Sequence, residues 1–189
     1  NAPQGHEYIE KAANEGLPGA MGICACDYYY GRGVALSHET GFEWALRGAK
    51  LGDTTSNDLC SAAYQTGVGT ARNIPLAIQH YRETLKSDPE NTDVMCDLAI
   101  CLSDISNEYG TFPSQSDYQE AFDLLSRAVE AGDVRAHGLL GIMYADGVGI
   151  DRDYDLAHHY IELAANNGYE PAQEMLSHFR RNMRGKWTV

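Results

Sequence analysis

The distribution of apolar residues is clearest over residues 134–168, where it predicts two helices joined by a short turn. In the first half, small and apolar residues recur at the period of one helix face, at Ala136, Leu140, Gly141 and Tyr144. The pattern breaks at glycines 147 and 149. It resumes after Asp153, a residue type that caps helix N-termini, and ends at Gly168. This segment therefore predicts one helical hairpin.

The same hairpin recurs along the chain in a single register. The position that closes each unit is spaced by 36, 36, 44 and 36 residues, at Gly16, Gly52, Asp88, Gly132 and Gly168. The tyrosine of the first helix has counterparts at Tyr28, Tyr64, Ile100 and Tyr144. The residue expected to cap the second helix is Ser37, Asn73, Asp117 or Asp153. Because one hairpin cannot bury both of its apolar faces, this recurrence predicts a stacked array.

The register defines a half-unit at 5–16, repeats at 17–52, 53–88, 89–132 and 133–168, and a C-terminal capping helix at 169–184. We therefore predict an all-α fold that forms a single domain over 1–189. The third repeat departs most from the pattern, with eight extra residues and no glycine pair. Its inserted region, 103–117, is rich in turn formers and fits either an extended first helix or a protruding loop.

The string GIMYADGVGI at 141–150, continued by the helix that follows Asp153, closely resembles the Sel-1-like repeat, a relative of the tetratricopeptide repeat. The first and second units keep its Tyr-x-x-Gly-x-Gly pattern at 28–33 and 64–69, whereas the third keeps mainly its second helix. The resemblance covers nearly the whole chain. It implies a right-handed α/α superhelix of about four repeats plus capping helices. It also implies protein binding, as in bacterial adaptors or in immunity proteins that neutralise secreted toxins.

Composition narrows the class of partner. The 189-residue chain is 43% apolar, as is typical of soluble proteins, and lacks an apolar run of the roughly 20 residues that cross a bilayer. Its formal net charge of −13 disfavours nucleic acids and anionic membranes, which both reward a basic face. Over 86–133 there are eleven acidic and two basic residues. We therefore expect a protein partner, a basic one.

The five cysteines are expected to be free thiols. Cys24, Cys60 and Cys96 share one repeat column that points into the core, where cysteine packs as a small hydrophobe. Equivalent side chains of neighbouring repeats lie on the order of 10 Å apart, too far for a disulfide. Unpaired cysteines favour a cytoplasmic location, and a periplasmic one would require a removed export signal.

The sequence favours neither catalysis nor a cofactor. The glycine pairs lack the preceding strand, the third glycine and the Lys-Ser/Thr of phosphate-binding loops. The seven histidines form no metal-binding motif, and His80 falls in a column where a packed, hydrogen-bonded side chain is expected. A nucleophilic cysteine would have to come from a core column. The alternative is an enzyme with hydrolase activity, as proposed for cysteine-containing relatives of this family.

The predicted function is noncatalytic binding of a partner in the concave groove that the first helices line in the related tetratricopeptide arrangement. The register, together with the acidic third-repeat insert, assigns the partner-binding residues Tyr29, Tyr30, Asp58, Gln65, Asp97, Asp104, Glu108, Tyr109, Phe112, Asp117, Arg135 and Asp146. It also directs Leu98, Cys101 and Leu102 into the groove. In the insert, the acidic residues would capture a basic partner and the two aromatic residues would anchor it. The alternative for the groove tyrosines and leucines is packing within the curve.

Overall fold

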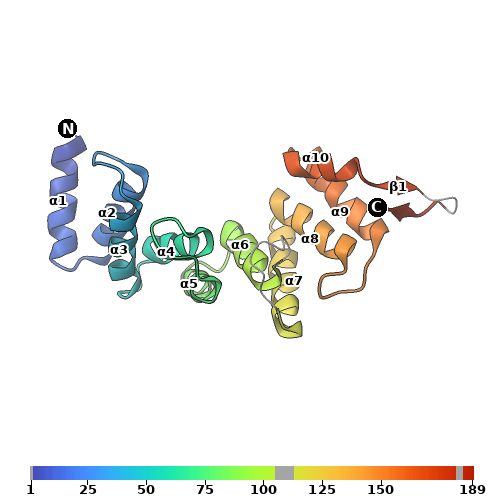
Figure 1. Cartoon of the computed structure of the whole chain (residues 1–189), viewed down its shortest axis with the longest axis horizontal. Coiled ribbons are helices and arrows are strands. Elements are labelled where there is room, and N and C mark those ends of the chain that lie inside the picture. Colours follow the sequence, from blue (N-terminus) through green and yellow to red (C-terminus); the bar gives the residue numbers. More distant parts are fainter. Residues whose placement is uncertain (1, 105–112, 182–184) are drawn as a thin grey trace. The chain divides into compact units, whose positions relative to one another are not determined.

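The computed structural model describes residues 2–104, 113–181 and 185–189 (Figure 1). Its helices are α1 (Ala2–Asn14), α2 (Pro18–Tyr30), α3 (His38–Ala49), α4 (Thr54–Thr66), α5 (Ile74–Ser87), α6 (Thr92–Ser103), α7 (Gln115–Glu130), α8 (Val134–Asp146), α9 (Tyr154–Asn166) and α10 (Glu170–Leu176). The strands within these ranges are β1 (Arg180–Arg181) and β2 (Trp187–Thr188). The predicted all-α fold of helical hairpins is confirmed.

The contacts divide the chain into two compact units, Asn1–Pro89 and Glu90–Val189. In the first unit, α1 packs on α2, and the hairpins are α2–α3 and α4–α5. In the second unit, the hairpins are α6–α7 and α8–α9, and α10 packs on α9. The helices thus follow the predicted repeats within each unit. A single continuous domain across both units stays a prediction.

Side-chain caps fix where the second helices begin. The side chains of Ser37, Asn73 and Asp153 accept backbone N–H groups at the starts of α3, α5 and α9, as the register predicts. The third repeat differs from the prediction. There Ser114 caps α7 and Asp117 sits three residues inside, in a reciprocal capping box in which the Asp117 carboxylate accepts the Ser114 N–H at 2.8 Å. The second helix of the third repeat therefore begins three residues earlier than the repeat register predicts.

The glycine pair between the two helices of a hairpin has two roles. Its first glycine ends the helix in the left-handed conformation, as Gly67 and Gly147 do with φ of 79° and 70°. Its second glycine allows close packing, because a Cβ on Gly69 or Gly149 would overlap the first turn of the preceding second helix. The third repeat lacks the pair, and Asp104 ends α6 with φ of 44°.

The predicted cysteine column is buried, and the tyrosine column is half-buried. Cys24, Cys60 and Cys96 are 0% exposed, and their counterpart Leu140 is 2% exposed. All five cysteines are free, as predicted. The expected packing of His80 is also confirmed. Its Nδ1 lies 2.9 Å from Oδ1 of Asn57, and its ring stacks on Tyr64.

The C-terminal helix is shorter than predicted. Instead of spanning 169–184, α10 ends at Leu176, and β1 then pairs with β2 in an antiparallel hairpin. The hairpin is anchored on α9, where the Trp187 ring stacks on His158 with centroids 3.7 Å apart. Phe179, between α10 and β1, is 6% exposed and packs edge-on against the same histidine. These long-range aromatic contacts outweigh the local helical pattern.

Candidate functional site

The first helices of neighbouring repeats contact each other, α2 with α4 in the first unit and α6 with α8 in the second. We call the surface formed by their outward positions the first-helix face. Its sequence-predicted members are Tyr29, Tyr30, Asp58 and Gln65 in the first unit, and Asp97, Arg135 and Asp146 in the second. The two units are separate compact bodies, and each carries its own part of this face.

In the first unit, the structure separates the predicted residues into held and accessible side chains. Burial raises the pKa of Tyr29, and its ring meets the His38 ring with centroids 4.8 Å apart. The Tyr81 hydroxyl donates to Gln65 Oε1 at 2.5 Å. Tyr30 is 57% exposed, although its ring contacts Tyr29 and the Arg32 guanidinium, and Asp58 is an exposed residue as well. The accessible part of this face is therefore one aromatic ring and one carboxylate.

In the second unit, two predicted residues satisfy each other. The Arg135 guanidinium of α8 donates to Oδ1 of Asp97 in α6 at 2.6 Å, and about a third of each side chain is exposed. Burial by itself lowers the pKa of Arg135, but the Asp97 carboxylate outweighs it and the pKa is raised. The predicted capture role for Asp97 is therefore weakened, because its charge is already paired within the protein.

Several other predicted positions have structural roles. Asp104 is 7% exposed at the end of α6, and Asp117 belongs to the capping box of α7. Leu98, Cys101 and Leu102 are at most 2% exposed, so for them the alternative of internal packing is correct. Glu108, Tyr109 and Phe112 lie outside the described residues. The insert as a binding site thus stays a prediction.

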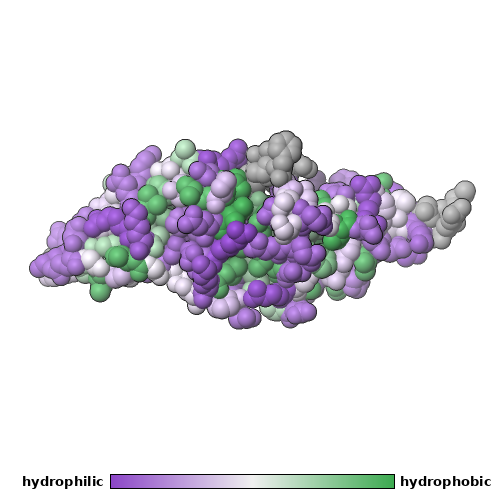
Figure 2. Space-filling model, turned by 90° about the horizontal axis from the view of Figure 1, so that it is seen from below, coloured by the Kyte–Doolittle hydropathy of each residue, from purple (hydrophilic) through white to green (hydrophobic). Residues whose placement is uncertain are grey.

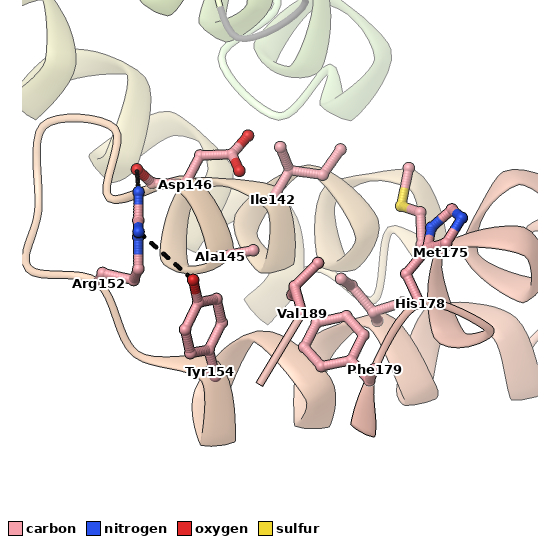
Figure 3. A pocket seen from close by; sticks show the side chains of 10 residues that line it. Ile142, Ala145, Asp146, Arg152, Tyr154, Met175, His178, Phe179 and Val189 are labelled. Atoms are coloured by element: carbon pink, nitrogen blue, oxygen red, sulfur yellow. Dashed lines mark hydrogen bonds between the residues drawn. The ribbon is translucent and has the colours of Figure 1, made fainter. Parts of the chain in front are cut away.

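The second unit contains an apolar pocket on the first-helix face, between α8, α9 and α10 (Figure 3). Its volume is about 360 Å³, within the usual range for ligand sites. It is lined by Ile142, Ala145, Asp146, Arg152, Tyr154, Ile161, Met175, His178, Phe179 and Val189. Among the predicted site residues that the structure describes, Asp146 lines the pocket.

Arg152, in the loop between α8 and α9, lines one side of this pocket and links the end of α8 to the start of α9. Its guanidinium donates to the Asp146 backbone carbonyl at 3.1 Å and to the Tyr154 hydroxyl at 3.4 Å (Figure 3). Arg152 and Tyr154 were not predicted from the sequence. They lie in the turn after the glycine pair and at the start of α9, outside the first-helix columns. An arginine two residues before a tyrosine gives no signal of such a contact until the hairpin is folded.

The described residues offer no activated nucleophile. Burial raises the pKa of Cys24 to about 11, and that of Cys60, Cys96 and Cys101 to about 12. Burial also raises the pKa of Cys26, against the lowering effect of Arg32. Among the described residues, no group of three or more histidine, cysteine or acidic side chains is arranged to hold a metal ion. None of the described helices combines the length and apolarity needed to cross a bilayer.

A family model of the Sel1 repeat matches residues 1–17, 20–53, 57–86, 93–133 and 134–169. These matches cover most of the chain, which therefore belongs to the Sel1 repeat family. Proteins of this family are generally protein-interaction modules and typically noncatalytic scaffolds.

The chain resembles several known proteins. It is 31% identical over 127 residues to the chitin synthase regulator SKT5 of Saccharomyces cerevisiae, across 66% of this chain and 17% of the regulator. A protective antigen of uropathogenic Escherichia coli, which displays an SLR fold, superposes on 94% of this chain and 36% of its own with a TM-score of 0.75 at 23% identity. A Sel1 repeat protein from Oxalobacter formigenes superposes on 85% and 61% with a TM-score of 0.68 at 26% identity. The chain spans less than two thirds of each of these proteins.

Proposed function

We propose that this chain is a noncatalytic adaptor that binds a protein partner through its first-helix face. The apolar pocket beside Asp146 supports this most directly, because it lies on the face that the repeat register assigns to a partner. On the face of the molecule shown in Figure 2, hydrophobic residues lie in groups among hydrophilic ones. A non-obligate interface is about as apolar as the rest of a protein surface, so such a mixed surface is compatible with reversible association of folded proteins.

Two observations favour an adaptor over the alternatives. The thiols of the described structure have raised pKa values, which disfavours the hydrolase reading, because the thiolate is the nucleophile. The yeast relative is named as a regulator of another protein, which favours adaptor over toxin-neutralising immunity protein.

Charge supports a basic partner. The sequence of the second unit contains 17 acidic and seven basic residues, and the first contains ten acidic and seven basic ones. The acidic excess therefore lies mainly in the unit that carries the pocket. A basic surface approaching this unit would be steered by its field, which acts over about 8 Å at physiological ionic strength.

The proposal is tested by site-specific photocrosslinking in the native host. A photoreactive phenylalanine analogue is placed at Thr66 or Ile142 on the first-helix face, and in matched controls at Glu43 of α3 or Leu156 of α9, on second helices. We expect the same protein to be captured from Thr66 and Ile142 and not from the controls. Capture from the second-helix positions instead would contradict the proposed face. The identity of the adduct distinguishes an adaptor's target from a toxin.

A further inference from the structure

The pocket beside Asp146 has apolar walls supplied by three elements. Ile142 and Ala145 come from α8, Met175 lies on α10, and Phe179 follows α10 (Figure 3). Ile161 of α9, 2% exposed, also lines it. A surface of this kind gains free energy by covering an apolar group and offers little to a strongly hydrated one.

The two charged side chains that line the pocket, Asp146 and Arg152, differ in the number of hydrogen bonds that they make. The Arg152 guanidinium is engaged by the Asp146 carbonyl and the Tyr154 hydroxyl. The Asp146 carboxylate, by contrast, is on an exposed residue and takes part in no hydrogen bond or ion pair within the described residues. In Figure 3 it points away from Arg152. The acceptors of Arg152 are uncharged, so its positive charge remains at the loop side of the pocket, while the negative charge of Asp146 is available to a ligand on the side that faces away from Arg152.

We propose that this pocket receives one bulky apolar side chain of a partner protein, flanked by a lysine or arginine that pairs with the Asp146 carboxylate. This inference rests on the proposed function and specifies the chemistry of its partner. Two features carry the assignment: the apolar walls select the side chain, and the unpaired carboxylate selects its neighbour. The acidic excess of the second unit favours the same basic segment.

A protein segment suits the pocket better than a free small molecule does. The pocket is open to solvent and adjoins the half-buried outward positions of α8, with the exposed Asp146 at its edge, so a chain entering it continues along the first-helix face. Its volume of about 360 Å³ accommodates an aromatic or leucine side chain with room for the flexible Met175 to adjust. An apolar anchor with a charged neighbour is the common form of an interface hot spot.

The methionines provide a direct reporter of binding. The chain has five, and Met175 lines the pocket, whereas Met21 and Met95 are 4% and 1% exposed in cores elsewhere. The full chain is labelled with 13C at its methionine methyl groups, and the Met175 signal is assigned by its loss in Met175→Leu. Three peptides are titrated: acetyl-Gly-Lys-Phe-Lys-Gly-amide, the same peptide with glutamates for the lysines, and the same peptide with alanine for phenylalanine.

We expect the lysine–phenylalanine peptide to shift the Met175 signal while the Met21 and Met95 signals stay in place. The alanine peptide should produce no shift, and the glutamate peptide should bind about two- to fivefold more weakly, the range for an exposed ion pair. Asp146→Asn should remove most of that preference. Asp123→Asn, at an exposed position of α7, makes the same change in net charge away from the pocket and should preserve the preference.

Each other result overturns the inference in a recognisable way. An unmoved Met175 signal at the solubility limit of all peptides shows that the pocket takes no such side chain. Equal binding of the lysine and glutamate peptides removes the role of Asp146. A Met175 shift with free indole but with none of the peptides makes the pocket a small-molecule site. If Thr66 and Ile142 nevertheless capture one partner, the proposed function stands while this inference fails.

Discussion

The ring of Tyr64 in α4 meets the ring of Phe42 in α3 edge-on, with centroids 5.1 Å apart and planes at 86°. The equivalent pair in the second unit, Phe122 of α7 and Tyr144 of α8, has the same geometry at 6.1 Å and 84°. In both cases the second helix of one hairpin contacts the tyrosine column of the next. The tyrosine column therefore packs within its own hairpin and also contacts the preceding one.

A double-mutant cycle on Phe42→Leu and Tyr64→Leu should measure how much this contact between hairpins contributes to stability. Edge-to-face aromatic pairs contribute about 1 kcal/mol beyond area burial, so we expect the two losses to be non-additive by about that amount in urea denaturation. Phe42→Leu combined with Tyr30→Leu is the control, because Tyr30 is 57% exposed and its ring contacts Tyr29 and the Arg32 guanidinium. Additive losses in both cycles would show that the edge-on contact contributes nothing specific.

Gly149→Ala should destabilise the second unit more than Gly168→Ala does. Both glycines have positive φ, 69° and 92°, so each substitution incurs the left-handed strain of about 1–2 kcal/mol. In addition, a Cβ on Gly149 would overlap the Tyr118 side chain, whereas nothing lies within 4 Å of one on Gly168. Thermal denaturation should therefore show a further loss of about 1–3 kcal/mol for Gly149→Ala. Equal losses would mean that Tyr118 moves aside freely.

Periodicity was sufficient to predict the hairpins because burial repeats with the helix and the columns recur. Cys24, Cys60 and Cys96 are buried for that reason. The start of α7 was harder, since Ser114 and Asp117 are both capping types and only the local Ser-x-x-Asp box distinguishes them. The candidate site depends more on contacts between residues that are distant in the sequence, and the repeat pattern gives no information about such contacts.

Two such contacts account for the differences at the site. Asp97 and Arg135 were both placed on the first-helix face, but their pairing across 38 residues was not predicted. The C-terminal hairpin depends on Trp187 stacking on His158 of α9, and its formation shortens α10. Two walls of the pocket, at Phe179 and Val189, exist only because of that hairpin. The sequence therefore predicted the face but not the pocket on it.

The cysteines should react in two classes. Cys24, Cys60, Cys96 and Cys101 are at most 2% exposed, with pKa values raised by burial to about 11 or 12, whereas Cys26 is half-buried. We expect iodoacetamide at pH 8 to modify native protein once, at Cys26, before any other site. Mass measurement after alkylation of denatured, unreduced protein should show five adducts. Fewer than five in the denatured sample would reveal a disulfide.

The C-terminal hairpin should loosen in acid. Burial lowers the pKa of His158 below its ordinary value of 6.5, so as the pH falls the histidine of a detached hairpin is protonated before the stacked one. The stack is therefore fully stable above about pH 6.5 and weakens below it. In a Trp44→Phe background, Trp187 fluorescence should shift toward that of exposed tryptophan between pH 7.5 and 5.

A non-titrating variant provides the control for that measurement. His158→Phe keeps an aromatic partner for Trp187 and removes the proton-binding group. Its Trp187 emission should be constant over the same pH range. If the wild-type emission is constant too, protonation of His158 does not control the hairpin.

The Asp97–Arg135 pair tests whether the first-helix face is held by its own charges. Each single alanine variant leaves a partly buried charge without its partner, so both should destabilise. The charge-reversed double variant, Asp97→Arg with Arg135→Asp, should recover part of the loss, with a coupling of about 1 kcal/mol. The exposed pair Glu83–Lys86 on α5, with side chains 45% and 69% exposed, is the control and should couple by less than about 0.5 kcal/mol.

The same variants separate a structural role of Asp97 from capture of a partner. If Asp97 only holds α6 to α8, both alanine variants should lower stability and leave the association rate with the crosslinked partner unchanged. If its charge also attracts a basic partner, Arg135→Ala should speed association because it frees the carboxylate, and Asp97→Ala should slow it. Because Arg135 already neutralises Asp97 at 2.6 Å, we expect the structural outcome. Stopped-flow association at two salt concentrations distinguishes the cases, since attraction by the freed carboxylate weakens with salt whereas packing does not.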